Sequence, residues 1–129
     1  MILLRLVDTR SPNEIQESIR RALSGKNEKV HVFTHLSHVY SSGSSIYTTY
    51  LFRLADTAEE TLERWHAIKS AASRAIVDAG GTISHQHGVG TDHKAYLSAE
   101  KGDLGIDLLR RISARLDPDQ RMNPGKLVD

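Results

Sequence analysis

Residues 46–54, Ile-Tyr-Thr-Thr-Tyr-Leu-Phe-Arg-Leu, are the clearest β-strand pattern in the chain. Most of these positions carry β-branched or aromatic side chains, which favour a pleated and half-buried backbone. Residues 30–39 alternate in polarity over much of their length, as a strand with one buried face does. Between the two lie Tyr40-Ser-Ser-Gly-Ser-Ser45, which are mostly turn-forming residues. The two segments are therefore predicted to pair as an antiparallel hairpin.

Helical patterns lie on both sides of this hairpin in the sequence. Residues 12–24 carry apolar side chains at steps of three and four, and Pro12 suits the first helical turn. Thr57-Ala-Glu-Glu60 is a capping box, whose two polar side chains satisfy free N–H groups at a helix start. The helix that it opens ends at Gly80-Gly81 and is the longest in the chain. Its predicted inward residues are Leu62, Trp65, Ile68, Ala72, Ala75, Ile76 and Ala79.

The order of the predicted elements indicates the fold class. Short apolar segments at 2–7 and 82–85 are predicted as the first and last strands, and a further helix is predicted at about 103–116. Through residue 85 the order is strand, helix, strand, strand, helix, strand. That is the ferredoxin-like split-βαβ order, an α+β fold with helices on one face of an antiparallel sheet. A C-terminal helix and an irregular tail follow. The last helix is expected to turn Leu104, Leu108, Leu109, Ile112 and Leu116 inward and Arg110, Arg111 and Arg115 outward.

Bulk composition narrows the functional class. The 129 residues fit one domain, and 39% hydrophobic with 26% charged residues is ordinary for a soluble globular protein. A formal net charge of +1 gives no overall case for nucleic acid or an anionic membrane. The absence of cysteine excludes disulfides and cysteine-ligated metal sites. We therefore expect a cytoplasmic protein with no nucleic-acid partner.

Residues 80–94, Gly-Gly-Thr-Ile-Ser-His-Gln-His-Gly-Val-Gly-Thr-Asp-His-Lys, are the best candidate for chemistry. On an extended backbone His85 and His87 project to the same face. Gly88 and Gly90 then let the chain turn sharply or approach a ligand closely. Two imidazoles at a strand end suit proton transfer beside a flat cofactor or a phosphate. The alternative is that two polar histidines lie on a solvated turn.

Three separated stretches together resemble the C-terminal part of flavin-linked enzymes of the vanillyl-alcohol oxidase superfamily. They are residues 40–47, the run 80–90 with Lys94, and the tail Leu116-Asp-Pro-Asp-Gln-Arg-Met-Asn-Pro-Gly-Lys-Leu127. The resemblance is strongest to the alkylglycerone-phosphate synthases, which make ether lipids. It implies that residues 1–100 are part of a cap-type substrate domain. It also implies that residues 101–129 pack against an FAD-binding domain absent from this chain.

The resemblance also implies roles for particular residues. Tyr40 matches the catalytic tyrosine, and His85 and His87 match the outer two of three consecutive histidines, while Gln86 replaces the middle one. Gly88 and Asn123 are the expected cofactor contacts. The implied reaction exchanges the acyl group of acyl-dihydroxyacetone phosphate for a fatty alcohol. FAD is the implied cofactor of the parent enzyme, and this chain alone is expected neither to hold it nor to be active.

Related flavin enzymes oxidise D-2-hydroxy acids, and some bind a divalent metal through a glutamate and two histidines that have six residues between them. The matching positions here are Tyr40, Tyr47 and Gln86, which are poor ligands for Zn²⁺ or Mn²⁺, so no metal is expected. Two alternatives remain open: an FAD-linked D-2-hydroxyacid oxidase or dehydrogenase, and a non-catalytic ferredoxin-like module. The substrate is therefore a lipid phosphate or a hydroxy acid. Self-association through exposed apolar surface on the first helix or the sheet edge is also expected.

Overall fold

A computed structural model of the chain describes residues 2–6, 11–26, 28–41, 43–84 and 86–128. Two compact units make up the chain, residues 1–85 and residues 86–129. The division between them falls before the predicted boundary after residue 100. Within the described ranges, no helix is long and apolar enough to cross a membrane.

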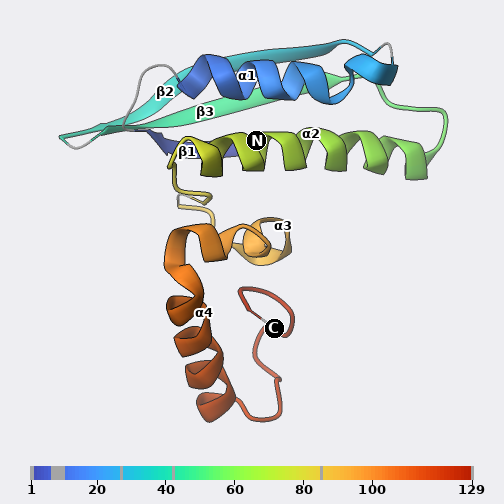
Figure 1. The fold of residues 1–129 in the computed structure, drawn as a ribbon. Coiled ribbons are helices and arrows are strands. Elements are labelled where there is room, and N and C mark those ends of the chain that lie inside the picture. The colour runs from blue at the N-terminus through green and yellow to red at the C-terminus, as the bar shows by residue number, and fades with distance from the viewer. Residues whose placement is uncertain (1, 7–10, 27, 42, 85, 129) are drawn as a thin grey trace. The chain divides into compact units, whose positions relative to one another are not determined.

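The described strands of the first unit form a three-stranded sheet (Figure 1). Its strands are β1 (Ile2–Leu6), β2 (Val30–Tyr40) and β3 (Gly43–Phe52), and their order across the sheet is β1-β3-β2. The central strand β3 pairs antiparallel with both neighbours. This arrangement confirms the α+β class and the predicted hairpin, and it matches the split-βαβ strand order.

Two predicted boundaries in this unit differ from the structure. Gly43, Ser44 and Ser45, expected in the polar link, belong to β3 and extend the hairpin toward its turn. Of the predicted last strand, 82–85, only Thr82 forms a bridge, and His85 lies outside the described residues. The segment is short because left-handed residues stand at both sides of it, Gly80 with φ 68° and Gln86 with φ 63°.

Helices α1 (Ser11–Ala22) and α2 (Ala58–Asp78) supply the apolar surface that covers the sheet. Contacts join α1 to β2 and to α2, and Figure 1 shows the two helices alongside each other on the sheet. Burying these side chains removes apolar area from water, worth about 1.5–3 kcal/mol for each large aliphatic group. The fully buried large side chains of this core are Ile15, Ile19, Leu23, Ile46, Ile68, Ile76 and Ile83.

The long helix α2 begins as the capping box predicts. Thr57 is its N-cap, and the Thr57 hydroxyl accepts a hydrogen bond from the Glu60 backbone N–H at 3.2 Å. Its inward face differs from the predicted one in two respects. Leu62 is 57% exposed, while Lys69 and Ser73 are buried beside Ile68, Ala72 and Ile76. The apolar stripe is therefore confirmed in its centre and wrong at its first turn.

The second unit contains α3 (Gly90–Lys94) and α4 (Leu97–Leu116). Gly102 (φ 67°, ψ 166°) interrupts α4, so the predicted start at about 103 coincides with the resumption of the helix after a kink. The predicted inward leucines are mostly exposed, with Leu104 at 82% and Leu116 at 76%. Leu97 and Ile106 are instead its buried residues. The apolar stripe of α4 is therefore present, but the described residues of this unit leave most of it exposed.

We predict that Thr57→Ala lowers the free energy of unfolding by about 1 kcal/mol, because the substitution leaves an N–H of the first turn of α2 without its acceptor. Urea unfolding followed by circular dichroism measures this. Thr57→Ser keeps the hydroxyl and serves as the control. Equal midpoints for the alanine and serine variants would show that this cap does not stabilise the fold.

Candidate functional site

The face of the sheet turned away from α1 and α2 carries the histidines of β2 together with Tyr40 and Tyr47. Ile46 and Thr48 of β3 are buried, so the alternate residues of β3 point to the opposite face, which we call the open face. Cross-strand register assigns β2 residues to the same face, because directly opposite residues share a face. Before the bulge described next, the open face carries His31, Phe33, His35, Tyr47, Thr49 and Leu51.

A β-bulge determines which way the end of β2 faces. The register shifts between Leu36, opposite Ile46, and His38, opposite Ser45. Ser45 is two residues from Tyr47 on the same strand, so it also belongs to the open face. His38, opposite Ser45, and Tyr40, two residues after His38, therefore lie on the open face as well. With unbroken alternation from Leu36, both side chains would face the helices. Bulges commonly re-aim side chains in this way.

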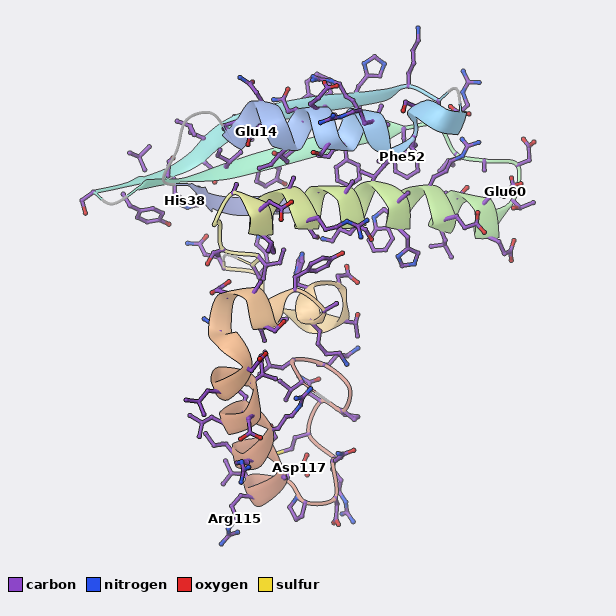
Figure 2. All side chains as sticks on the ribbon, viewed as in Figure 1. Glu14, His38, Phe52, Glu60, Arg115 and Asp117 are labelled. Carbon is purple, nitrogen blue, oxygen red and sulfur yellow. The ribbon has the colours of Figure 1, made fainter. Side chains whose placement is uncertain are left out.

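Tyr40, the predicted catalytic tyrosine, lies on the open face beside a histidine. The rings of His38 and Tyr40 are stacked, with centroids 6.1 Å apart and an interplanar angle of 7°. Tyr40 is 40% exposed, so its ring is accessible to a ligand while one side is supported. Figure 2 shows His38 near the hairpin end of the sheet.

Two hydroxyl groups contact the His38 imidazole at Nδ1. His38 Nδ1 lies 3.1 Å from Ser37 Oγ and 3.2 Å from Ser45 Oγ, and the two hydroxyl oxygens are 2.8 Å apart. Ser45 is fully buried, although it lies on the open face, and it thereby anchors this cluster. The arrangement forms one connected network of imidazole and hydroxyl groups at the bulge.

A second histidine–tyrosine stack lies further along the same face. His35 and Tyr47 are directly opposite in the β2–β3 register, and their ring centroids are 5.0 Å apart at 23°. The sequence showed histidines on this strand, but it gave them no partners. Once the hairpin register is known, the alternation of side chains along each strand places His35 and Tyr47 on the same face.

The predicted histidine pair has a different geometry from the one expected. His85 lies outside the described residues, and His87 is an exposed residue of the second unit. Gln86, Gly88 and Gly90 all have left-handed backbone conformations, with φ of 63°, 69° and 59°. The backbone around His87 is therefore a series of tight turns, and the expectation of an extended backbone at Gln86 is wrong. The projection of His85 and His87 to one face stays a prediction, because His85 lies outside the described residues. Tyr40 belongs to the first unit, so its convergence with His87 stays a prediction.

Gly88 and Gly90 offer open backbone in this turn. An added Cβ would meet nothing within 4 Å at either position, so the glycines are present for their backbone conformation and not for close packing. Such a backbone suits the approach of a flat or anionic ligand, which is the cofactor-contact role predicted for Gly88. Among the described residues, no group of three or more histidines or carboxylates could hold a metal ion.

The C-terminal tail is folded by its own polar contacts. Asp117, at the end of α4 (Figure 2), accepts hydrogen bonds from the backbone N–H groups of Arg121 at 3.0 Å and Met122 at 2.6 Å. Lys94 Nζ donates to the Gly125 carbonyl at 3.2 Å and ties α3 to the tail. Asn123, the other predicted cofactor contact, lies in this turn with φ 54° and lines a hollow of about 680 Å³ between α4 and the tail.

Comparison with known proteins identifies the family. Residues 10–127 match the model of the FAD linked oxidases, C-terminal domain. The chain is 26% identical over 114 residues to an alkyldihydroxyacetonephosphate synthase of Trypanosoma brucei brucei, covering 88% of this chain and 18% of that protein. It is 35% identical over 94 residues to the synthase of that name from Caenorhabditis elegans, covering 73% of this chain and 16% of that protein.

Similarity extends to a second group of flavin-linked enzymes. A probable mitochondrial D-lactate dehydrogenase of Danio rerio is 35% identical over 74 residues, covering 57% of this chain and 14% of that protein. The chain thus spans less than a fifth of the length of each of these relatives. Because the family match covers nearly the whole chain, the protein belongs to the FAD linked oxidases and corresponds to their C-terminal domain.

Proposed function

We propose that this chain is the C-terminal part of an FAD-dependent enzyme that acts as an alkyldihydroxyacetonephosphate synthase. In this proposal the acyl group of acyl-dihydroxyacetone phosphate is exchanged for a fatty alcohol, giving an ether lipid precursor. The observation that carries the proposal is Tyr40, accessible on the open face and supported by His38. The similarity of most of the chain to proteins named as such synthases supports it.

The residues present fit part of an FAD site. The open glycine backbone at Gly88 and Gly90, and the tail turn at Asn123, can approach a flat ring or its polar edge. When bound, FAD supplies an electrophilic ring system that activates the substrate carbon. The apolar stripe of α4, with Leu104 and Leu116 exposed, suits packing against an FAD-binding domain. This is the role proposed for residues 101–129.

Tyr40 is the residue proposed to move a proton. Its phenol hydroxyl can give a proton to the departing acyl oxygen, and the resulting phenolate can take one from the reacting carbon or from the incoming alcohol, whose oxygen loses its proton as it bonds to that carbon. His87 is exposed in a glycine-rich turn and is proposed to bind the substrate phosphate or relay protons, together with His85. An imidazolium donates from both ring nitrogens and suits a phosphate oxygen.

A second candidate function is oxidation of a D-2-hydroxy acid, which the likeness to D-lactate dehydrogenases favours. There a histidine would remove the hydroxyl proton while hydride passes to the flavin. The products separate the two functions in an assay of the complete parent enzyme. An ether lipid product supports the synthase, and a keto acid with reduced flavin supports the oxidase.

We predict that Tyr40→Phe in the complete enzyme lowers turnover by roughly 10²-fold or more, because it removes only the hydroxyl that transfers the proton. Flavin absorbance should be unchanged, which shows that the cofactor site is intact. The matched control is Tyr50→Phe, since Tyr50 has the parity of Ile46 and faces the helices. Equal turnover in Tyr40→Phe and the parent would remove Tyr40 from the mechanism.

We predict that the 129-residue chain alone binds no FAD stably. The cofactor contacts proposed for it are limited to a few backbone positions, and its described residues contain no glycine-rich strand-to-helix loop of the kind that cradles a dinucleotide phosphate. Purified chain should stay colourless after incubation with FAD and gel filtration. A flavin band at near one equivalent would contradict this prediction.

Self-association of the isolated chain is proposed as well, although through a different surface from the one first expected. The inward stripe of α1 is buried, whereas Phe33 and Leu51 on the open face are each 57% exposed. Exposed apolar patches favour association. Sedimentation at tens of micromolar should show species larger than a monomer, and Phe33→Lys should reduce them. A strictly monomeric parent chain would contradict the proposal.

A further inference from the structure

His38 is a second functional group on the open face, beside Tyr40. It differs from His31, which lies on the same strand and face, because His38 has partners on two sides. The Ser37 and Ser45 hydroxyls contact its Nδ1, and its ring stacks on Tyr40 at an interplanar angle of 7°. The three contacts connect a fully buried hydroxyl to the accessible phenol ring through one imidazole.

We propose that His38 is a positioning residue for Tyr40, holding the phenol ring in one orientation on the open face. This inference rests on the proposed function, in which Tyr40 transfers the proton. The Ser45 hydroxyl, buried and fixed in the central strand, sets the direction of the imidazole plane. The nearly parallel imidazole then limits rotation of the Tyr40 side chain about its first torsion.

The β-bulge at Ser37 also contributes to the position of His38. A regular strand would place only one β2 residue opposite Ser45, whereas the bulge places both Ser37 and His38 there. The Ser37 hydroxyl can therefore reach both the Ser45 hydroxyl and His38 Nδ1, at 2.8 Å and 3.1 Å. Nδ1 has a single hydrogen-bonding site, so the two hydroxyls share it, and the contact between them joins Ser37, Ser45 and His38 in one network.

Reacting groups must be held close to their productive geometry for rapid proton transfer, and a displacement of about 1 Å can cost on the order of 10²-fold in rate. Tyr40 is 40% exposed and ends β2 beside the hairpin turn. The stacked imidazole of His38 is one restraint on its ring. Loss of that restraint should act on the chemical step more than on substrate binding.

Two substitutions separate ring stacking from hydrogen bonding. His38→Phe keeps a flat ring beside Tyr40 and loses the contacts to Ser37 and Ser45. His38→Asn keeps a polar atom near the position of Nδ1 and loses the ring. His31→Phe and His31→Asn are matched controls, since they make the same changes on the same strand and face.

The first measurement uses this 129-residue chain. Side-chain coupling constants from NMR report whether the Tyr40 side chain holds one rotamer or averages among several, and Tyr40→Phe assigns its signals. We expect one rotamer in the parent and averaged couplings in His38→Asn, with an intermediate result in His38→Phe, which keeps the stacked ring without the hydroxyls that orient it. The His31 variants should match the parent. Unchanged Tyr40 couplings in His38→Asn, or averaging already present in the parent, would overturn the proposal.

The second measurement uses the complete enzyme. His38→Asn should lower kcat on the order of tenfold with little change in KM, and His38→Phe should restore most of kcat. Equal loss in both variants would overturn positioning by stacking in favour of proton transfer by the imidazole itself. If Tyr40→Phe leaves turnover unchanged, the proposed role of Tyr40 fails, and the couplings still decide whether His38 holds its ring.

Discussion

One constraint underlies the first unit: its helices cover the sheet on a single face. The central strand β3 is satisfied by hydrogen bonds on both edges, so its stability does not require side-chain burial on both faces. The buried isoleucines of α1 and α2, together with Leu23 and Ile46, supply the hydrophobic stabilisation. The opposite face is therefore free to carry imidazole and phenol rings, which would be costly to bury without partners.

The β-bulge in β2 places His38 and Tyr40 of the candidate site on the open face. Alternation from His31 through His35 places histidines on the open face, but continued alternation would turn Tyr40 toward the helices. One extra residue at Ser37 restores Tyr40 to the open face and adds a hydroxyl beside His38. This irregularity in the strand pairing therefore determines which face the Tyr40 phenol occupies, and the Ser44 hydroxyl donates to the His38 backbone carbonyl at 2.6 Å beside the interrupted pairing.

Sequence patterns predicted those features that depend on local chemistry. The hairpin, the α1 stripe and the Thr57 cap follow from alternation, helical periodicity and capping residues, and all three are confirmed. Burial in α4 was not predictable in this way, because periodicity marks an apolar stripe without showing whether anything covers it. The turn around His87 was missed for another reason: Gln86 takes a left-handed conformation that few side chains favour, and glycine spacing alone does not reveal it. The histidine–tyrosine stacks required the register, which depends on a bulge that the sequence does not mark.

The open face also bears on which chemistry the family member performs. Some D-2-hydroxyacid enzymes of this superfamily carry two metal-binding imidazoles at the positions of Tyr40 and Tyr47. Here phenols occupy those positions, and each has a histidine stacked on its ring. A phenol is a weaker ligand than an imidazole for a borderline cation, whereas a phenol supported by an imidazole suits proton transfer at carbon or oxygen. In the proposed function, the accessible Tyr40 phenol with its stacked imidazole therefore suits acid–base chemistry better than cation binding.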